Sequence, residues 1–438
     1  MPTGFTPKKI NFIVLCAMYA VLFVLALHRS PDPAIWHWSH LYFFFILYYF
    51  LFLALLTVLY ILSDKISRGY ALFLIVLYFL TVLLGDFMIG TINYSAHEKE
   101  MDHPIFHHQL KPGTYHLAID DDGMLDQKYI MHVNAQGLRS NKDIPYEKPA
   151  GHVRILSLGD SFTEGQGVGD EENFCYLVER QLNKESGSPV YEVLNAGVDS
   201  YAPILENLYL RTKGINFQPD LVVVFYDMSD LIQTQEYFDG AEFNKDGEVI
   251  SVPPNDDSLL SNMEVFLKSR FYFLSLVYGA ARERVLPDED PDAISQATEK
   301  LLKFSLSSDQ SPWKDEWERV FHDIDLMNEF CKQKGIGFAV VIYPWGHQVS
   351  GREWDSGRQW FGVPDNYTAP RGVEDMFVYE MERRGIPVLN LFPAFRDHQG
   401  GERLYFHEDM HWRKEGHSLA AQYIMEFFMN LSKPERAP

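Results

Sequence analysis

The chain has 438 residues, and its 60 Asp and Glu residues outnumber its 38 Lys and Arg residues, which gives a formal net charge of −22 at pH 7. Such an acidic surface repels the phosphates of DNA and RNA, so we expect no nucleic-acid partner. The length suits one large domain with added elements, or two domains. The three cysteines match neither a disulfide framework nor a zinc-ligand spacing. A bridge between Cys175 and Cys331 is one alternative, and we favour two buried free thiols.

Three apolar runs open the chain, at about Ile10–Leu27, Leu41–Leu62 and Tyr70–Ile92. A helix that spans a bilayer needs about 20 mainly apolar residues. We therefore interpret residues 1–93 as an all-α segment of three transmembrane helices. A cleaved signal peptide is the alternative for the first run, but two further runs follow it closely.

The basic residues around these runs predict an orientation. Lys8 and Lys9 precede the first run, Lys65 and Arg68 separate the second from the third, and only Arg29 lies between the first and the second. Because basic loops stay on the cytoplasmic side, the amino terminus is expected inside. Three crossings then place the remaining chain outside, as in a multi-pass protein of the bacterial inner membrane that carries an extracytoplasmic catalytic domain.

Residues 94–131 are rich in histidine and acidic residues. Clustered histidines can bind metal, but the spacing here matches no metal-ligand pattern. We interpret this stretch as a solvated juxtamembrane linker, and we expect neither a metal nor a cofactor. The histidines concerned are His97, His103, His107, His108 and His116.

From residue 132 to residue 433, apolar β-branched runs alternate with amphipathic stretches, which is typical of a parallel sheet covered by helices on both faces. The predicted strands are Val153–Leu158, Tyr191–Leu194, Asp220–Tyr226, Gly337–Tyr343 and Pro387–Leu391. The predicted helices are Glu171–Lys184, Pro203–Lys213, Glu316–Lys334, Val373–Arg384 and Lys414–Asn430. Sheets of this kind bind ligands at the carboxyl ends of their strands.

A stretch from about residue 232 to residue 312 interrupts this alternation. It contains Pro253-Pro254, the acidic segment Pro287–Asp292 and the apolar patch Phe266–Tyr278. We interpret it as an insertion beside the ligand site. A lid, an acceptor surface and a decorated loop are the alternatives for its role.

Ser161 stands at the end of the first predicted strand, directly after Gly159 and Asp160. A serine hydroxyl becomes a good nucleophile only when a base removes its proton and hydrogen-bond donors stabilise the oxyanion. His411 is the candidate base, and Asp409 can hold its imidazole in the required tautomer. A helix cap is the structural alternative for Ser161. Rival residues are Glu408 as the orienting group and His347, His407 and His417 as bases.

Three motifs carry a resemblance to a known family. Gly159-Asp160-Ser161-Phe162, Asn195-Ala196-Gly197 and Asp409-Met410-His411-Trp412 occur in this order. Their order and spacing resemble the SGNH (GDSL) hydrolase superfamily, and Val133–Arg139 resembles the lead-in segment of many bacterial members. The resemblance covers about Val133–Phe427, apart from the insertion, and implies a flavodoxin-like three-layer α/β fold.

The resemblance also implies site roles: Ser161 as nucleophile, His411 as base and Asp409 as its partner. The backbone N–H groups of Ser161 and Gly197 are expected in the oxyanion hole. Ser229 stands where the family supplies an Asn side chain, and its shorter hydroxyl can donate one hydrogen bond. The loss of one oxyanion donor typically costs roughly 10²–10³ in rate.

Three functions follow as hypotheses. The leading one is a serine esterase or deacylase that acts on an acylated carbohydrate or lipid outside the cytoplasm. The second is an O-acetyltransferase for cell-envelope polysaccharide, with a membrane partner protein that hands over the acyl group, because members with Asp-x-His-Trp also resemble domains that acetylate exported polysaccharides. The third is a catalytically weak binding module, which the Ser229 replacement suggests.

Overall fold

The computed structural model describes two compact units. One comprises Met1–Ser95 with Asp257–Asp288, and the other comprises Ala96–Asp256 with Glu289–Pro438. Within them, the described residues are 67–97, 99–119, 127–188, 190–245, 247–254, 303–360 and 369–431, with short pieces at 51–52, 54–55, 57–58, 266–267, 270–271 and 363.

The first unit contains one long described helix, α3 (Arg68–His97), which covers the third predicted apolar run. The first predicted run and most of the second lie outside the described residues. Within the part of the chain that the structure describes, no helix is both long enough and apolar enough to cross a bilayer. The predicted transmembrane segment therefore has no support from the structure.

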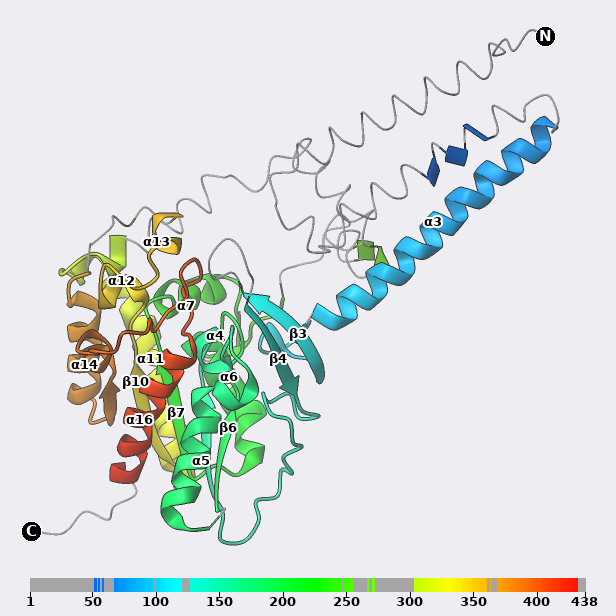
Figure 1. Ribbon diagram of the computed structural model, residues 1–438. Coiled ribbons are helices and arrows are strands. Elements are labelled where there is room, and N and C mark those ends of the chain that lie inside the picture. Colours follow the sequence, from blue (N-terminus) through cyan, green and yellow to red (C-terminus); the bar gives the residue numbers. More distant parts are fainter. Residues whose placement is uncertain are drawn as a thin grey trace, which may run out of the picture. The chain divides into compact units, whose positions relative to one another are not determined.

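The second unit is built on a five-stranded parallel sheet (Figure 1). Each predicted strand agrees with an observed one to within one residue at either end, because continuous β-branched runs suit strands that are buried on both faces. Numbered along the chain, the strand order is 2-1-3-4-5, which is the flavodoxin-like order. In sheet order the strands are β6 (Tyr191–Asn195), β5 (Val153–Leu158), β7 (Leu221–Tyr226), β10 (Gly337–Ile342) and β11 (Val388–Asn390).

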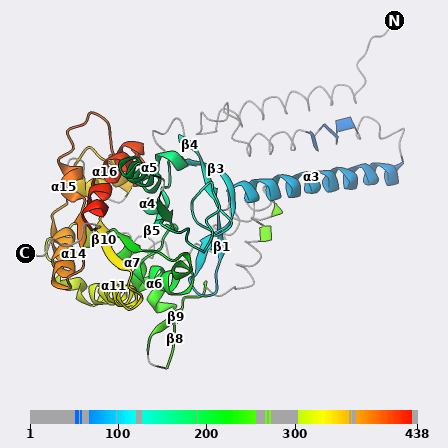
Figure 2. The same cartoon turned by 90° about the horizontal axis from the view of Figure 1, so that it is seen from below.

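Helices cover both faces of the sheet, so the predicted three-layer α/β fold is confirmed (Figure 2). On one side, α5 (Phe174–Ser186) packs against α16 (Lys414–Leu431). On the other side, α11 (Lys314–Lys334) packs against α6 (Pro203–Thr212), and its aromatic rings contact α14 (Gly372–Arg383). The shorter helical elements are α4 (Ser161–Glu164), η2 (Asp170–Glu172), η3 (Gly214–Phe217), α7 (Asp230–Asp239), η4 (Ser311–Trp313), α12 (Gly346–Val349), α13 (Gly357–Trp360) and α15 (Phe392–Arg396).

The two cysteines of this unit are buried free thiols. Cys175 lies on α5 and Cys331 lies on α11, which cover opposite faces of the sheet. The free-thiol interpretation is therefore confirmed, because the sheet separates the two sulfur atoms.

The described residues 99–119 and 127–133 form two antiparallel ribbons, so the prediction of a solvated linker is wrong for them. The side chains of Phe106, Leu110 and Tyr115 are buried in the main core. The physical reason is strand alternation, which in β4 points Tyr129 and Met131 toward the same buried face. The ribbons pair β1 (Glu100–Asp102) with β2 (His108–Leu110) and β3 (Gly113–Ile119) with β4 (Gln127–Val133).

The predicted insertion begins inside a regular element. Helix α7 runs through residue 232, and the ribbon of β8 (Glu242–Phe243) and β9 (Val249–Ser251) follows it. Most of the remaining insertion, including most of the apolar patch at Phe266–Tyr278, lies outside the described residues.

Candidate active site

The candidate nucleophile, Ser161, is the first residue of α4, directly after β5. Asp160 caps this turn, because its Oδ1 accepts a hydrogen bond from the Phe162 N–H at 2.9 Å. The hydroxyl of Tyr343, directly after β10, donates to the same oxygen at 2.8 Å.

The sheet topology also places Ser161 where ligands are expected. In the 2-1-3-4-5 strand order, successive strands are added on one side of β5 and then on the other, so the order reverses between β5 and β7. Ligands bind at such switch points, and Ser161 directly follows β5.

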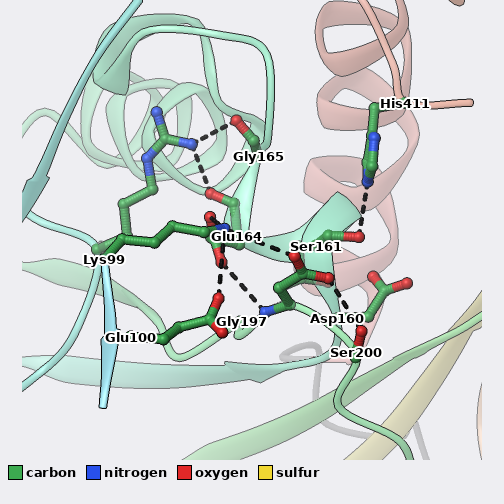
Figure 3. Close-up of polar contacts among 12 residues, drawn as sticks. Lys99, Glu100, Asp160, Ser161, Glu164, Gly165, Gly197, Ser200 and His411 are labelled. Atoms are coloured by element: carbon green, nitrogen blue, oxygen red, sulfur yellow. Dashed lines mark hydrogen bonds and ion pairs between the residues drawn. The ribbon is translucent and has the colours of Figure 1, made fainter. Parts of the chain in front are cut away.

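The structure brings the three predicted catalytic residues together, and Figure 3 shows Ser161 beside His411. The Oγ of Ser161 lies 2.6 Å from Nε2 of His411, although the two residues are 250 positions apart. The other ring nitrogen of His411, Nδ1, lies 2.5 Å from Oδ1 of Asp409, and this oxygen also accepts the His411 backbone N–H at 2.8 Å. Glu408 was the rival for the orienting group, and its backbone carbonyl accepts a hydrogen bond from the indole N–H of Trp354. The carboxylate at the His411 ring is that of Asp409.

The charges at this site suit a general base. Burial by itself disfavours a protonated His411, but the Asp409 carboxylate outweighs burial and raises the pKa of His411. Burial also opposes ionisation of Asp409, yet its contact with His411 holds the pKa of Asp409 below the ordinary value. Asp409 therefore stays ionised and stabilises the imidazolium that forms when His411 accepts a proton.

The rival histidines occupy other positions. His347 is completely buried, and burial lowers its pKa to about 3. His407 lies 3.0 Å from a carboxylate oxygen of Asp355. His417 is buried on α16, and burial holds its pKa well below the ordinary value. These rings belong to the surrounding packing, whereas His411 is the ring within hydrogen-bond distance of Ser161.

Two predicted oxyanion donors are already engaged in hydrogen bonds. The N–H of Gly197 donates to the side-chain oxygen of Asn195 at 3.0 Å, because Asn-Ala-Gly forms an Asx turn. A glycine is required here by packing, since a Cβ atom would lie 2.3 Å from the backbone nitrogen of Glu164. The hydroxyl of Ser229 donates to Asp227 at 2.6 Å, because its short side chain reaches the carboxylate of its own turn. The expected oxyanion roles of Gly197 and Ser229 therefore lack support from this geometry.

Two backbone amides are candidates for the oxyanion hole: the N–H of Ser161, which was predicted, and the N–H of Ser200, which was not. The N–H of Ser161 lies at the first position of α4, where an amide has no acceptor within the helix. Ser200 lies in the same pocket and has φ of 59°, a left-handed conformation that non-glycine residues rarely adopt. Sequence reasoning missed Ser200, because a backbone donor leaves no signature in residue type.

An open pocket of about 420 Å³ surrounds Ser161. Its lining combines side-chain amides, aromatic rings and carboxylates. No described residue of the lining is a Lys or an Arg, whereas Asp199 and Glu236 are acidic. Trp345 is held by a hydrogen bond of 2.6 Å from its indole N–H to Asp227. The lining residues are Asp160, Ser161, Phe162, Gln166, Asp199, Ser200, Ser229, Ile232, Gln233, Glu236, Trp345, Asp409, Met410 and His411.

Trp412 anchors the loop that carries His411. It is completely buried, and its ring centroid lies 4.9 Å from that of Tyr343 and 5.1 Å from that of Phe395. It also contacts Phe162, the residue after the nucleophile, at 5.4 Å. A single indole therefore packs against both the nucleophile turn and the loop of the base.

Buried carboxyl groups lie behind the nucleophile. Burial raises the pKa of Asp160, Asp227 and Asp230, and their mutual repulsion adds to the shift for Asp160 and Asp230. Even so, no group of three or more His, Cys, Asp or Glu in the described ranges is arranged to hold a metal ion.

Comparison with known proteins gives one family match. Residues 316–438 match the family model "SGNH hydrolase-like domain, acetyltransferase AlgX". This segment carries Asp409 and His411, and Ser161 lies outside it. Comparison with the sequences of curated proteins gave no match.

Several solved structures are distantly similar. The lipase/acylhydrolase from Enterococcus faecalis is 15% identical, with a TM-score of 0.33 over 65% of this chain and 100% of that one. A GDSL-like lipase from Bacteroides thetaiotaomicron is 14% identical, with a TM-score of 0.31 over 65% and 92%. A catalytic mutant of an acetylxylan esterase from Geobacillus stearothermophilus is 10% identical, with a TM-score of 0.32 over 64% and 96%.

The family assignment rests on the matched carboxyl-terminal segment and on the motif order, and the distant structures add no weight to it. Gly-Asp-Ser follows β5, Asn-Ala-Gly begins at the last residue of β6, and Asp-x-His precedes α16. The first and the third of these motifs meet at one pocket. The match of residues 316–438 to an SGNH hydrolase-like family model therefore supports the predicted resemblance to the SGNH hydrolase superfamily.

Proposed function

We propose that the protein is a serine-dependent esterase or deacylase that removes acyl groups from a neutral O-acylated carbohydrate. The observation that carries the proposal is the chain of contacts from Ser161 Oγ to His411 Nε2 at 2.6 Å and from His411 Nδ1 to Asp409 at 2.5 Å. A hydroxyl, an imidazole and a carboxylate in this sequence are the parts that acyl transfer through a serine requires.

In the proposed reaction, His411 Nε2 takes the proton of Ser161 as Oγ attacks the ester carbonyl carbon. The oxyanion that forms accepts hydrogen bonds from the N–H groups of Ser161 and Ser200. As the intermediate collapses, the C–O bond to the sugar breaks and His411 returns its proton to the departing alcohol. A water molecule, deprotonated by His411, then attacks the acyl-enzyme, and the carboxylic acid and free Ser161 are released.

The lining of the pocket supports a neutral carbohydrate as the substrate. The amides of Gln166 and Gln233 can hydrogen-bond sugar hydroxyls, and Trp345 offers an aromatic surface. The carboxylates of Asp199 and Glu236 would repel a polyuronate, as would the net charge of −22. An acylated lipid is the alternative substrate.

Labelling with a fluorophosphonate, which reacts with activated serines, tests the proposal. We expect the folded wild type to be labelled and to hydrolyse a chromogenic acetate. Ser161→Ala should lose both properties, whereas Ser186→Ala, at an exposed serine that ends α5, should keep them. Absence of labelling in the folded wild type would contradict the proposal and favour a catalytically weak binding module.

An O-acetyltransferase for cell-envelope polysaccharide is the second candidate, because the matched family model names an acetyltransferase. A sugar hydroxyl would then intercept the acyl-enzyme in place of water, and a membrane partner protein would supply the acyl group. The two candidates are separated by product analysis with a chromogenic acetate and added neutral oligosaccharide. Acetate release at an unchanged rate supports the hydrolase, and acetylated oligosaccharide formed at the expense of acetate supports the transferase.

We further propose that the catalytic unit acts outside the cytoplasm, next to the inner membrane of a bacterium. The support is the sequence pattern of apolar runs with Lys8, Lys9 and Lys65 on the side expected inside, together with exposed apolar side chains such as Leu80 and Leu84 on α3. Alkaline phosphatase fused to the carboxyl terminus should be active, since it folds only outside the cytoplasm. A fluorescent cytoplasmic reporter in the same position together with an inactive phosphatase would contradict this placement.

A further inference from the structure

Two side chains of the ribbon segment that precedes the sheet reach the candidate active site. The first is Lys99, whose side chain is 14% exposed and whose Nζ lies 2.5 Å from Oε1 of Glu164. Glu164 ends the turn that begins with Ser161, and its side chain is completely buried. Figure 3 shows Lys99 extending to Glu164 beside the nucleophile.

The ion pair continues to the loop after β6. The second carboxylate oxygen of Glu164 accepts the backbone N–H of Asp199 at 3.1 Å, and Lys99 Nζ lies 3.9 Å from the Asp199 carboxylate. Burial opposes the charge on Lys99, but the carboxylates of Glu164 and Asp199 outweigh it and raise the pKa of Lys99. The amino group therefore stays charged and holds Glu164 against the start of the Asp199–Ser200 peptide.

The second side chain is His108 on β2, which is buried. Its Nε2 lies 2.7 Å from the carbonyl oxygen of Asp199. A carbonyl can only accept, so Nε2 carries the hydrogen and donates it. In return, the hydroxyl of Tyr201 donates to the His108 carbonyl at 2.5 Å. The loop and the ribbon are thus joined on both sides of Ser200.

The carbonyl of Asp199 and the N–H of Ser200 belong to one peptide group. None of the peptide bonds among the described residues is cis, and in a trans peptide the C=O and N–H point in opposite directions. The carbonyl faces His108, so the N–H faces the other way, and Ser200 lines the pocket of Ser161. These contacts hold Ser200 at its φ of 59°.

We propose that Lys99 and His108 are positioning residues that fix the Asp199–Ser200 peptide so that the Ser200 N–H donates to the oxyanion formed at Ser161. This inference rests on the proposed serine mechanism and extends it to a segment outside the sheet. The ribbon thereby becomes part of the machinery that stabilises the transition state, because Lys99 and His108 act through the Asp199–Ser200 peptide and not on the reacting atoms themselves.

Kinetics of Lys99 variants test the proposal on the full chain. A displacement of about 1 Å in a catalytic donor can cost about 10² in rate, so Lys99→Met should lower kcat by about that factor and leave KM nearly unchanged. Lys99→Arg should restore most of the loss, because it keeps the charge next to Glu164. The matched control is Lys128→Met, at an exposed position on β4. Rates are compared on the high-pH plateau, because Lys99 also lowers the pKa of His411.

Inhibition by a trifluoromethyl ketone separates positioning from general damage. This ketone forms an anionic tetrahedral adduct with an active serine and therefore needs the oxyanion donors. We expect its affinity for Lys99→Met and for His108→Leu to fall in parallel with kcat, whereas the affinity for the sugar product is unchanged. The double variant Lys99→Met with Glu164→Gln leaves no unpaired buried charge, so it keeps the test valid if the single variant fails to fold.

The outcomes distinguish the inference from the proposed function. An active wild type whose kcat survives both Lys99→Met and His108→Leu overturns the positioning role and leaves the serine mechanism standing. Equal losses in ketone and product affinity also overturn it, because they indicate general disorder of the pocket. A folded wild type that neither reacts with the ketone nor turns over ester overturns the proposed function itself.

Discussion

Asp409→Asn tests the electrostatics of the site most directly. One oxygen of Asp409 accepts both the ring Nδ1–H and the backbone N–H of His411. An asparagine keeps the size of the side chain but removes its charge, and its NH₂ group can face Nδ1, which then becomes an acceptor. The hydrogen of the imidazole moves to Nε2, which can no longer accept the proton of Ser161. We expect kcat/KM to fall by about 10⁴, as tautomer loss does in serine proteases, which corresponds to about 5.4 kcal/mol of transition-state stabilisation.

The pH dependence provides a second readout. The reaction needs neutral His411, so activity falls as pH drops through the pKa of that residue. Asp409 raises this pKa above the ordinary value of 6.5, so the acidic limb of the wild-type profile should lie above pH 6.5. Removal of the carboxylate charge lowers the pKa, and the limb of the residual Asp409→Asn activity should move to lower pH. Initial rates with a chromogenic acetate across the titration range of imidazole measure both effects.

Glu408→Gln is the matched control, because Glu408 is the neighbouring carboxylate and the ring of His411 contacts Asp409 instead. We expect it to keep nearly wild-type kcat/KM and the wild-type acidic limb. The reasoning is refuted if Asp409→Asn stays within about tenfold of the wild type, a loss of only about 1.4 kcal/mol, or if Glu408→Gln causes the larger loss.

Three further variants probe other features. Ser229→Ala should change kcat little, because its hydroxyl is bonded to Asp227; a loss of roughly 10²–10³ in a chromogenic-acetate assay would instead identify Ser229 as an oxyanion donor. Trp412→Ala should lower the free energy of unfolding by about 3–5 kcal/mol in urea denaturation, because it empties a fully buried aromatic site; an unchanged unfolding midpoint would contradict the packing described for this indole. Glu236→Gln should raise turnover of acetylated uronate oligosaccharides relative to neutral ones by about two- to fivefold at low salt, and the gain should vanish at high salt; a change in the opposite direction would contradict the charge argument for a neutral substrate.

The sheet and its helices were predictable from the sequence for a clear reason. Runs such as Leu221–Tyr226 and Gly337–Ile342 are apolar throughout, and only a strand buried on both faces suits such a run. The ribbon segment was not predicted, because its many histidines and acidic residues are typical of a solvated linker. The alternation of buried and exposed side chains with a period of two, which indicates a strand, was not used. That signal was present in Gln127–Val133, where buried positions alternate with more exposed ones.

The candidate site was predictable to a different extent. Ser161, Asp409 and His411 were found because their residue types and order carry the chemistry, and the structure brings them into contact. Of the two candidate oxyanion donors, the N–H of Ser161 was predicted and the N–H of Ser200 was not. A backbone N–H is common to almost every residue, so its role depends on where the chain turns. The ribbon contacts of Lys99 and His108 depend on tertiary packing, which no local pattern encodes.

The contact between Ser161 and His411 has a consequence for biosynthesis. The two residues are 250 positions apart. A growing chain therefore contains the nucleophile turn long before it has a base. The emerging polypeptide is expected to be unreactive toward esters until the loop of His411 has been synthesised and α16 has docked. Any truncation that removes the last helix and its preceding loop should yield an inert product, however well the first strands have formed.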